Sequence, residues 1–202
     1  MTDFSTQAAE ATLRMRKLFP ATPLQRNDYL SLAYDADIWL KREDLSPVRS
    51  YKLRGAYNAM SKQMDKQVFV CASAGNHAQG VAFVCRHMCK NGVIFMPVTT
   101  PQQKINKTKL FGGEWVEVRL VGDYFDDTLR ASQAYCSEVG GHFLSPFDDQ
   151  DVIEGQATVT HEMLEQLEGA PDILVVPVGG GGLSSSARRL LMERAPDTEI
   201  FY

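Results

Sequence analysis

Short apolar runs alternate with longer amphipathic stretches from residue 67 to the end of the 202-residue chain. The runs that predict β-strands lie at 67–72, 92–97, 114–120, 142–144, 172–177 and 198–202. The stretches with helical periodicity lie at 76–90, 101–111, 124–139, 152–167 and 183–194. Strands that alternate with helices of this length form parallel sheets with right-handed crossovers. The sequence therefore predicts an α/β fold.

The first part of the chain has fewer regular signals. Its predicted elements are a helix at 5–19, a strand at 37–41, a charged loop at 42–47 and a helix at 52–62 with Ser50 as N-cap. Farther on, the acidic and turn-rich segment 145–149 interrupts the alternation and indicates a boundary. We therefore expect a large domain made of 1–48 and 148–202, with a small α/β domain at 49–147 between its two parts.

Composition limits the classes of partner. The formal net charge of −4 argues against nucleic acid or an anionic membrane as the main partner. No apolar run approaches the roughly 20 residues that span a bilayer, and the N-terminal stretch has no apolar core of the signal-peptide kind. We expect a cytoplasmic protein that acts on a small molecule.

The four cysteines do not form a metal-binding pattern. Cys85 and Cys89 lie four positions apart, on one face of a predicted helix, but the sequence has no CxxC pair and no HExxH motif. We expect Cys71, Cys85, Cys89 and Cys136 to be buried, reduced thiols and predict no metal site.

Three loops are predicted to meet at one edge of the fold, because ligands of open parallel sheets bind beyond the carboxyl ends of the strands. The run Gly179–Gly182 follows a buried strand and precedes a helix, so its N–H groups can bind one phosphate. A flexible turn is the alternative for this run. No Gly-Lys-Ser/Thr follows it, so it is not a P-loop, and no early GxGxxG unit indicates a dinucleotide site.

The other two loops carry side chains that suit an amino-acid ligand. The loop 73–77 has small residues with free amides that suit a carboxylate, although it could be only an N-cap turn. Lys52 opens a predicted helix between Arg49 and Arg54, and nearby positive charge or burial lowers the pKa of a lysine. A lysine of lowered pKa reacts with an aldehyde, whereas most lysines are simply solvated.

A resemblance connects these loops. Residues 50–56 (SYKLRGA) resemble the cofactor-lysine motif Ser-x-Lys-x-Arg-Gly-Ala of the fold-type II pyridoxal-phosphate enzymes, in particular the threonine dehydratase group. SAGNHAQG resembles that group's substrate-carboxylate loop, and VGGGGL resembles its phosphate loop. KREDLSPVRS, FMPVTTPQQK, GDYFDD and IEGQAT match further segments in the same order and spacing, so that the resemblance runs from about Thr22 to Leu183.

The resemblance implies a role for each loop. Lys52 would bind the aldehyde of pyridoxal 5′-phosphate covalently, Tyr51 would wall the site, and Asn76 would hydrogen-bond the ring hydroxyl of the cofactor. The substrate carboxylate would be bound by Ser73, Ala74, Gly75, Asn76 and His77. The phosphate would be bound by backbone amides of Gly179, Gly180, Gly181, Gly182 and Leu183.

The resemblance also implies a fold and a reaction. The fold would have two open, mainly parallel sheets flanked by helices, like that of tryptophan synthase β, with a large domain that is incomplete at residue 202. The reaction would convert L-threonine into 2-oxobutanoate and ammonia, in isoleucine biosynthesis or threonine catabolism, in a cytoplasmic homodimer or homotetramer. Two alternatives stay open: a serine dehydratase or serine racemase, and a truncated fragment that folds and associates without turnover.

Overall fold

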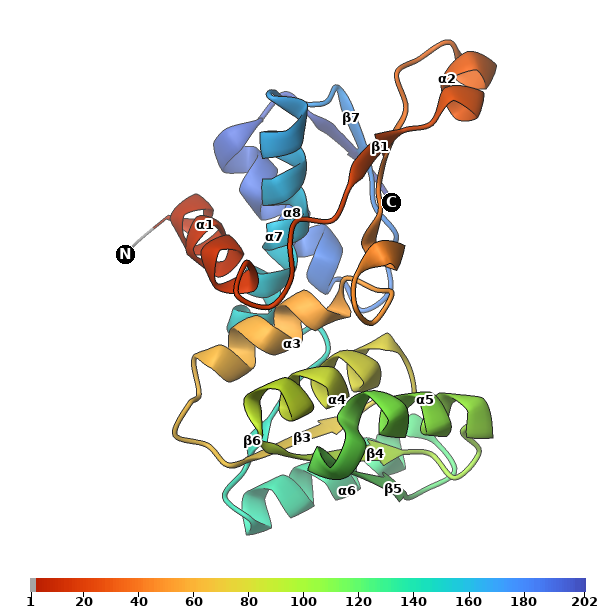
Figure 1. Ribbon diagram of the computed structural model, residues 1–202, viewed down its shortest axis with the longest axis vertical. Helices are drawn as coiled ribbons and strands as arrows, with labels where there is room; N and C mark the ends of the chain where they lie inside the picture. Colours follow the sequence, from red (N-terminus) through yellow and green to blue (C-terminus); the bar gives the residue numbers. More distant parts are fainter. Residues whose placement is uncertain (1–2) are drawn as a thin grey trace.

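Four parallel strands form the sheet of the lower lobe in the computed structural model, which describes residues 3–202 (Figure 1). Their order is β5-β4-β3-β6, with bounds Val116–Leu120, Asn91–Met96, Val68–Ala72 and His142–Phe143. The central pair is in register from Val68 opposite Asn91 to Ala72 opposite Phe95. The strands predicted in this region are confirmed.

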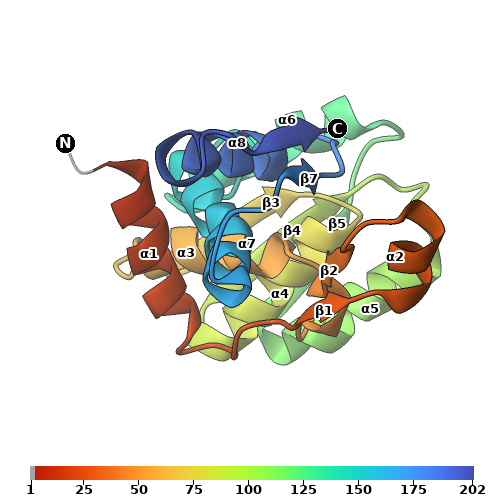
Figure 2. The same ribbon diagram turned by 90° about the horizontal axis from the view of Figure 1, so that it is seen from above.

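Helices cover both faces of this sheet. Helices α4 (Asn76–Met88) and α5 (Gln102–Gly112) lie on one face, and α6 (Phe125–Glu138) lies on the other (Figures 1 and 2). Because successive strand residues point to opposite faces, Phe69 packs in the core beneath α4 while Val70 packs against α6. Burial on both faces explains why these strands are continuous apolar runs.

The upper lobe contains the second parallel sheet. Its elements are α1 (Phe4–Met15), α7 (Gln150–Leu167), β7 (Ile173–Val175), α8 (Gly182–Arg194) and β8 (Glu199–Phe201). Strands β7 and β8 pair in parallel with Ile173 opposite Glu199. Helices α1, α7 and α8 share an apolar cluster that contains Ala8, Ala157 and Leu190. Two parallel sheets flanked by helices confirm the predicted fold class.

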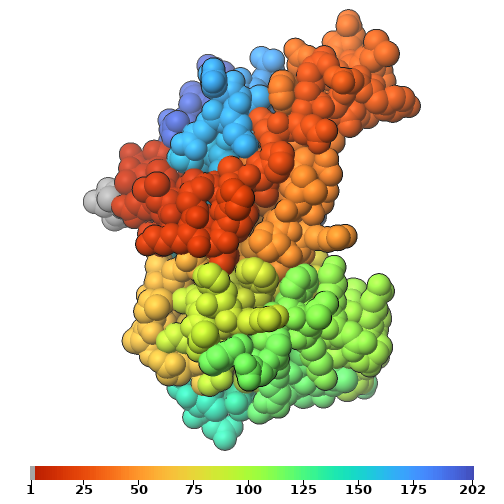
Figure 3. Space-filling view, viewed as in Figure 1, coloured from red at the N-terminus to blue at the C-terminus, as the bar shows by residue number. Residues whose placement is uncertain are grey.

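Helix α3 (Lys52–Ser61) lies between the two lobes (Figures 1 and 3). Two glycines allow it to approach a helix of each lobe at backbone distance. A Cβ atom added to Gly80 of α4 would lie 3.1 Å from the backbone nitrogen of Leu53. One added to Gly155 of α7 would lie 2.5 Å from the carbonyl oxygen of Arg54. This packing fixes Lys52, the first residue of α3, at the junction of the lobes.

An arm projects from the upper lobe (Figures 1 and 3). It consists of the antiparallel strands β1 (Leu24–Arg26) and β2 (Trp39–Lys41) with the short helix α2 (Asp28–Tyr34) between them. Neither β1 nor α2 is predicted from the sequence. Tyr29 and Leu32 of α2 are 81% and 87% exposed, so this helix has no buried apolar face whose periodicity could have predicted it.

Some predicted helix ends differ by a turn or less. The helix predicted at 5–19 ends at Met15, and Pro101 is the N-cap of α5 rather than its first residue. Tyr51 occupies the N-cap position of α3 that was predicted for Ser50, although Ser50 Oγ accepts a hydrogen bond from the Lys52 N–H at 3.3 Å. Two 3₁₀ helices, at Glu43–Leu45 and Gly113–Trp115, complete the elements of the described part of the chain.

One cysteine prediction is wrong. Cys71, Cys85 and Cys136 are buried free thiols, but Cys89 is exposed because it forms the C-cap of α4 in a left-handed conformation (φ 53°). Among residues 3–202, no helix combines the length and the apolar character that crossing a bilayer requires. Met1 and Thr2, the start of the predicted segment 1–48, lie outside the described residues.

Candidate active site

Lys52 is half-buried where the lobes meet. Its Nζ donates a hydrogen bond to the Pro146 carbonyl oxygen at 2.6 Å and stands 5.5 Å from the centre of the Tyr51 ring. Burial lowers the pKa of Lys52 from its ordinary value, and the positive end of α3 also disfavours a cation there. More of this amine is therefore uncharged than in a solvated lysine, and the uncharged amine is the form that attacks an aldehyde.

The glycine run forms an open turn between β7 and α8. Gly181 adopts a left-handed conformation (φ 85°) and is the N-cap of α8, which begins at Gly182. A Cβ atom added to Gly179 or Gly181 would meet no heavy atom within 4 Å. The first N–H groups of a helix have no partner within the helix, so this turn presents backbone donors toward open space.

The segment 144–147, here called the crossing segment, carries the chain from the lower lobe toward α7 and connects Lys52 with the glycine run. Its Pro146 carbonyl accepts the hydrogen bond from Lys52. Its Phe147 ring lies so close to Gly180 that an added Cβ atom would overlap it. Lys52 and the glycine run therefore lie near each other, because each contacts one of the two consecutive residues Pro146 and Phe147.

Tyr51 and Leu183 strengthen this connection. Tyr51 packs against the apolar cluster of Val176, Leu183 and Ala187, which lies at the start of α8. The residue before the lysine thus packs against the cluster that contains Leu183, the residue after the glycine run. From the sequence, the segment 145–149 is predicted only as a domain boundary. Its turn-rich composition gave no signal that it touches both halves of the site.

The loop 73–77 follows β3, as predicted, and leads into α4. Ser73 Oγ accepts a hydrogen bond from the Gly75 N–H at 3.2 Å, Ala74 packs against the lower-lobe core, and Asn76 is exposed. His77 is only 2% exposed, and its Nε2 lies 3.0 Å from the Leu144 carbonyl oxygen. The loop therefore reaches the crossing segment through His77.

Arg54, Glu43, Glu162 and Lys41 form a buried ion cluster that no sequence pattern predicted. The Arg54 guanidinium, with no exposed surface, donates to Glu43 at 2.8 Å and to Glu162 at 2.7 and 2.9 Å. Lys41 Nζ donates to Glu162 at 2.8 Å. Burial alone would raise the pKa of Glu162, but hydrogen bonds from Arg54 and the charges of Arg54 and Lys41 lower it to about 2.

This cluster corrects one expectation about Lys52. The sequence placed Arg54 near Lys52 as a positive charge that would lower its pKa. Residues two positions apart on a helix do not face each other, and Arg54 points instead to Glu162 on α7. Burial, and not Arg54, lowers the pKa of Lys52.

Comparison with known proteins decides the family. The model of the family described as "Pyridoxal-phosphate dependent enzyme" matches residues 16–202. The chain belongs to this family. It is 49% identical over 182 residues to the biosynthetic L-threonine dehydratase of Bacillus subtilis (strain 168), covering 89% of this chain and 43% of that protein. The corresponding enzyme of Staphylococcus aureus (strain NCTC 8325 / PS 47) is 48% identical over 197 residues, covering 95% and 47%.

Solved structures agree with this membership. The processed form of threonine deaminase isoform 2 from Solanum lycopersicum superposes with a TM-score of 0.87 at 36% identity, covering 97% of this chain and 54% of that one. Maize serine racemase superposes with a TM-score of 0.90 at 25% identity, covering 98% and 60%. The chain spans about half the length of the curated relatives it matches.

The residues present fit pyridoxal phosphate. The open glycine turn at a helix N-terminus suits its phosphate, and the Lys52 amine of lowered pKa suits its aldehyde. Both lie against Pro146 and Phe147, as one small ligand requires. The individual roles of Tyr51, Asn76 and the loop 73–77 stay predictions.

Proposed function

We propose that this chain carries the cofactor-binding part of an L-threonine ammonia-lyase, which converts L-threonine into 2-oxobutanoate and ammonia. The observation that carries the proposal is the approach of Lys52 and the glycine run to the crossing segment, in a chain 49% identical to a biosynthetic L-threonine dehydratase. Isoleucine biosynthesis is the pathway this relative favours. Catabolism of threonine is the alternative.

Different residues of this chain would bind the cofactor, bind the substrate and remove the α-proton. When bound, pyridoxal phosphate supplies an electron sink for negative charge at the substrate α-carbon. Lys52 Nζ would hold the cofactor at its aldehyde, and as a free amine it would take the substrate α-proton. Backbone amides of Gly179–Leu183 would bind the phosphate, and Asn76 the ring hydroxyl. The loop 73–77 would bind the substrate carboxylate and orient the α-proton toward Lys52.

A cofactor-trapping experiment tests the central assignment. Wild type incubated with pyridoxal phosphate should gain a visible absorbance band, and borohydride reduction followed by peptide mapping should place the label on Lys52. Lys52→Ala should lose the band, because it removes the amine that lies beside Pro146. Lys104→Ala, which removes an exposed lysine on α5, is the matched control and should keep it. A band that survives in Lys52→Ala would reassign the cofactor lysine.

The likeness to maize serine racemase keeps serine as a second substrate. One methyl group separates threonine from serine, and a methyl group in an apolar pocket gives only about 1–3 kcal/mol of discrimination. Turnover of L-threonine against L-serine, with chiral detection of D-serine, separates the dehydratase from the racemase. Cofactor absorbance without turnover of either amino acid would support a chain that binds cofactor but needs further residues for catalysis.

We also infer the organisation of the protein. A division into 1–48, 49–147 and 148–202 is supported by the passage of the chain between lobes at the crossing segment and by the separate sheets of the lobes. A cytoplasmic homodimer or homotetramer is proposed from the family resemblance. Size-exclusion chromatography with light scattering tests the oligomeric state.

A further inference from the structure

The crossing segment is held at three points between the lobes. The Leu144 N–H donates to the Val70 carbonyl of β3 at 2.8 Å, and the Leu144 carbonyl contacts His77 Nε2 at 3.0 Å. Two residues later, the Pro146 carbonyl accepts from Lys52, and the Phe147 ring lies on Gly180. A shift of Leu144 would therefore change the separation between the Lys52 contact and the glycine-run contact.

The chemistry of His77 fixes what its side chain can do. A carbonyl oxygen only accepts, so Nε2 must carry the hydrogen in the bond to Leu144. Burial, together with the positive charge of Lys52, lowers the pKa of His77 to about 4 even though the Leu144 carbonyl favours the charged form. At neutral pH the ring is uncharged, and its buried Nδ1, which has no partner among the described residues, is an acceptor.

We propose that His77 is a positioning residue, whose Nε2–H holds the crossing segment and so sets the separation between the Lys52 amine and the glycine run. The inference rests on the proposed function, since it concerns a cofactor that Lys52 and the glycines bind together. The side chain does not bind the substrate carboxylate, because its one donor is used on Leu144 and Nδ1 cannot donate to a carboxylate. Only the backbone N–H of His77, at the start of α4, is available for that role.

Two ligands can distinguish a positioning role of His77 from a role in the overall stability of the protein. Pyridoxal 5′-phosphate uses the amine and the glycine run together, so its affinity depends on their separation. Pyridoxine 5′-phosphate carries the same ring and phosphate without the aldehyde, so its affinity does not depend on the Lys52 amine. A change in the separation should weaken the first ligand and leave the second unchanged.

Two variants of His77 distinguish the effect of its Nε2–H donor from the effect of its ring. The amide nitrogen of glutamine can reach the position of Nε2, whereas that of asparagine reaches only the position of Nδ1. The dissociation constants of both ligands are measured by absorbance and fluorescence for three proteins: the wild-type chain, the His77→Gln variant and the His77→Asn variant. His77→Asn should bind pyridoxal 5′-phosphate about tenfold more weakly, the scale of one lost buried hydrogen bond. Its affinity for pyridoxine 5′-phosphate should stay within about twofold of wild type, and His77→Gln should resemble wild type with both ligands.

The contrary outcomes are distinct. Unchanged binding of pyridoxal 5′-phosphate by His77→Asn, or equal weakening of both ligands, would overturn the positioning role. A selective loss in His77→Gln would do the same, because that variant retains the donor. Should His77→Asn fail to fold, ¹⁵N spectra of wild-type His77 decide: a hydrogen on Nδ1 and none on Nε2 contradicts the inference. Failure of the proposed function has another signature, in which Lys52→Ala binds pyridoxal 5′-phosphate as tightly as wild type.

Discussion

Replacing Arg54 by methionine should destabilise the protein severely. Arg54 is fully buried and donates to Glu43, Glu162, Thr22 and Thr158. Methionine fills a similar volume but leaves two carboxylates without their shared partner, and breaking a buried ion pair in this way costs about 3–5 kcal/mol. For a chain of this size, about 2–4 °C of unfolding midpoint is lost per kcal/mol, so a decrease of roughly 6–20 °C is expected.

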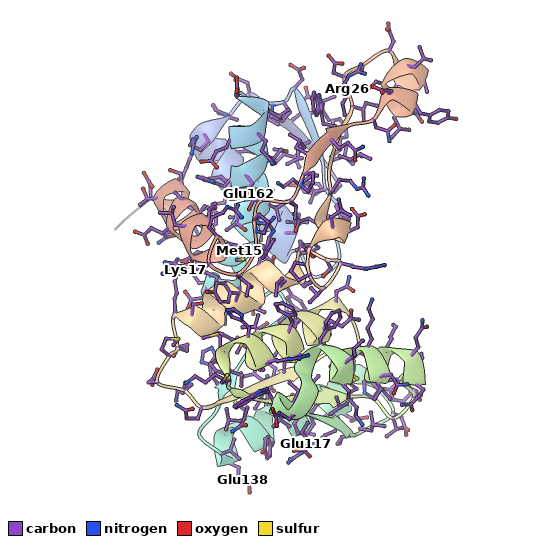
Figure 4. The ribbon with its side chains drawn as sticks, viewed as in Figure 1. Met15, Lys17, Arg26, Glu117, Glu138 and Glu162 are labelled. Atoms are coloured by element: carbon purple, nitrogen blue, oxygen red, sulfur yellow. The ribbon has the colours of Figure 1, made fainter. Side chains whose placement is uncertain are left out.

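Thermal unfolding followed by circular dichroism at pH 7 measures this effect. Arg26→Met is the matched control, because Arg26 also pairs with two carboxylates, Asp28 and Asp37, but on the exposed arm, where solvent screens the charges. Figure 4 shows Glu162 in the interior of the upper lobe and Arg26 on the arm. The control should leave the midpoint nearly unchanged. An Arg54→Met midpoint within about 2 °C of wild type, or no lower than the control, would refute the argument.

Acid should destabilise the protein in two stages. Burial lowers the pKa of His77 from 6.5 to about 4, so the unfolded chain binds more protons between these values, and about 3 kcal/mol of stability is lost as the pH falls through them. Glu162, whose ordinary value is 4.5, should add a loss of similar size toward pH 2. Urea titrations from pH 7 to 3 should show the first stage in wild type but not in His77→Gln; a flat wild-type curve from pH 7 to 4 is the contrary result. Gly180→Ala should weaken binding of pyridoxine 5′-phosphate about tenfold, because its Cβ atom displaces the Phe147 ring. The loss should be much smaller in a Phe147→Ala background, whereas equal losses in both backgrounds would place the strain elsewhere.

The general position of the site could be predicted from the sequence. Alternating strands and helices fix a parallel sheet, and the carboxyl ends of its strands then fix where ligands bind. The glycine run and Lys52 were expected at one crevice on this ground, and both contact the crossing segment. This inference succeeds because strand direction follows from local periodicity and from crossover handedness, without knowledge of any distant contact.

The contacts that hold the site could not be predicted in the same way. Lys52 and Pro146 are 94 positions apart, and Arg54 and Glu162 are 108 positions apart. Which of many lysines, arginines and carboxylates meet depends on how α3 lies against α7, and that depends on the absence of side chains at Gly55 and Gly155. A glycine in a predicted helix indicates a loss of helix propensity; it does not reveal which backbone will approach it.

Helix α7 explains why the two ends of the site stay together although they lie far apart in sequence. Its Gly155 allows the backbone of α3 to pack against it, and its Glu162 accepts a hydrogen bond from Arg54, which follows Lys52 by two residues. Its Ala157 packs with Leu190 of α8, the helix that begins at the glycine run. Helix α3, which begins at Lys52, and helix α8, which follows the glycine run, thus share α7 as a neighbour. The loop 73–77 instead follows β3 of the lower lobe and reaches the site through His77 and Leu144. The site proposed for the cofactor therefore depends on the packing of α7 within the upper lobe and on the crossing segment, which His77 of the lower lobe holds.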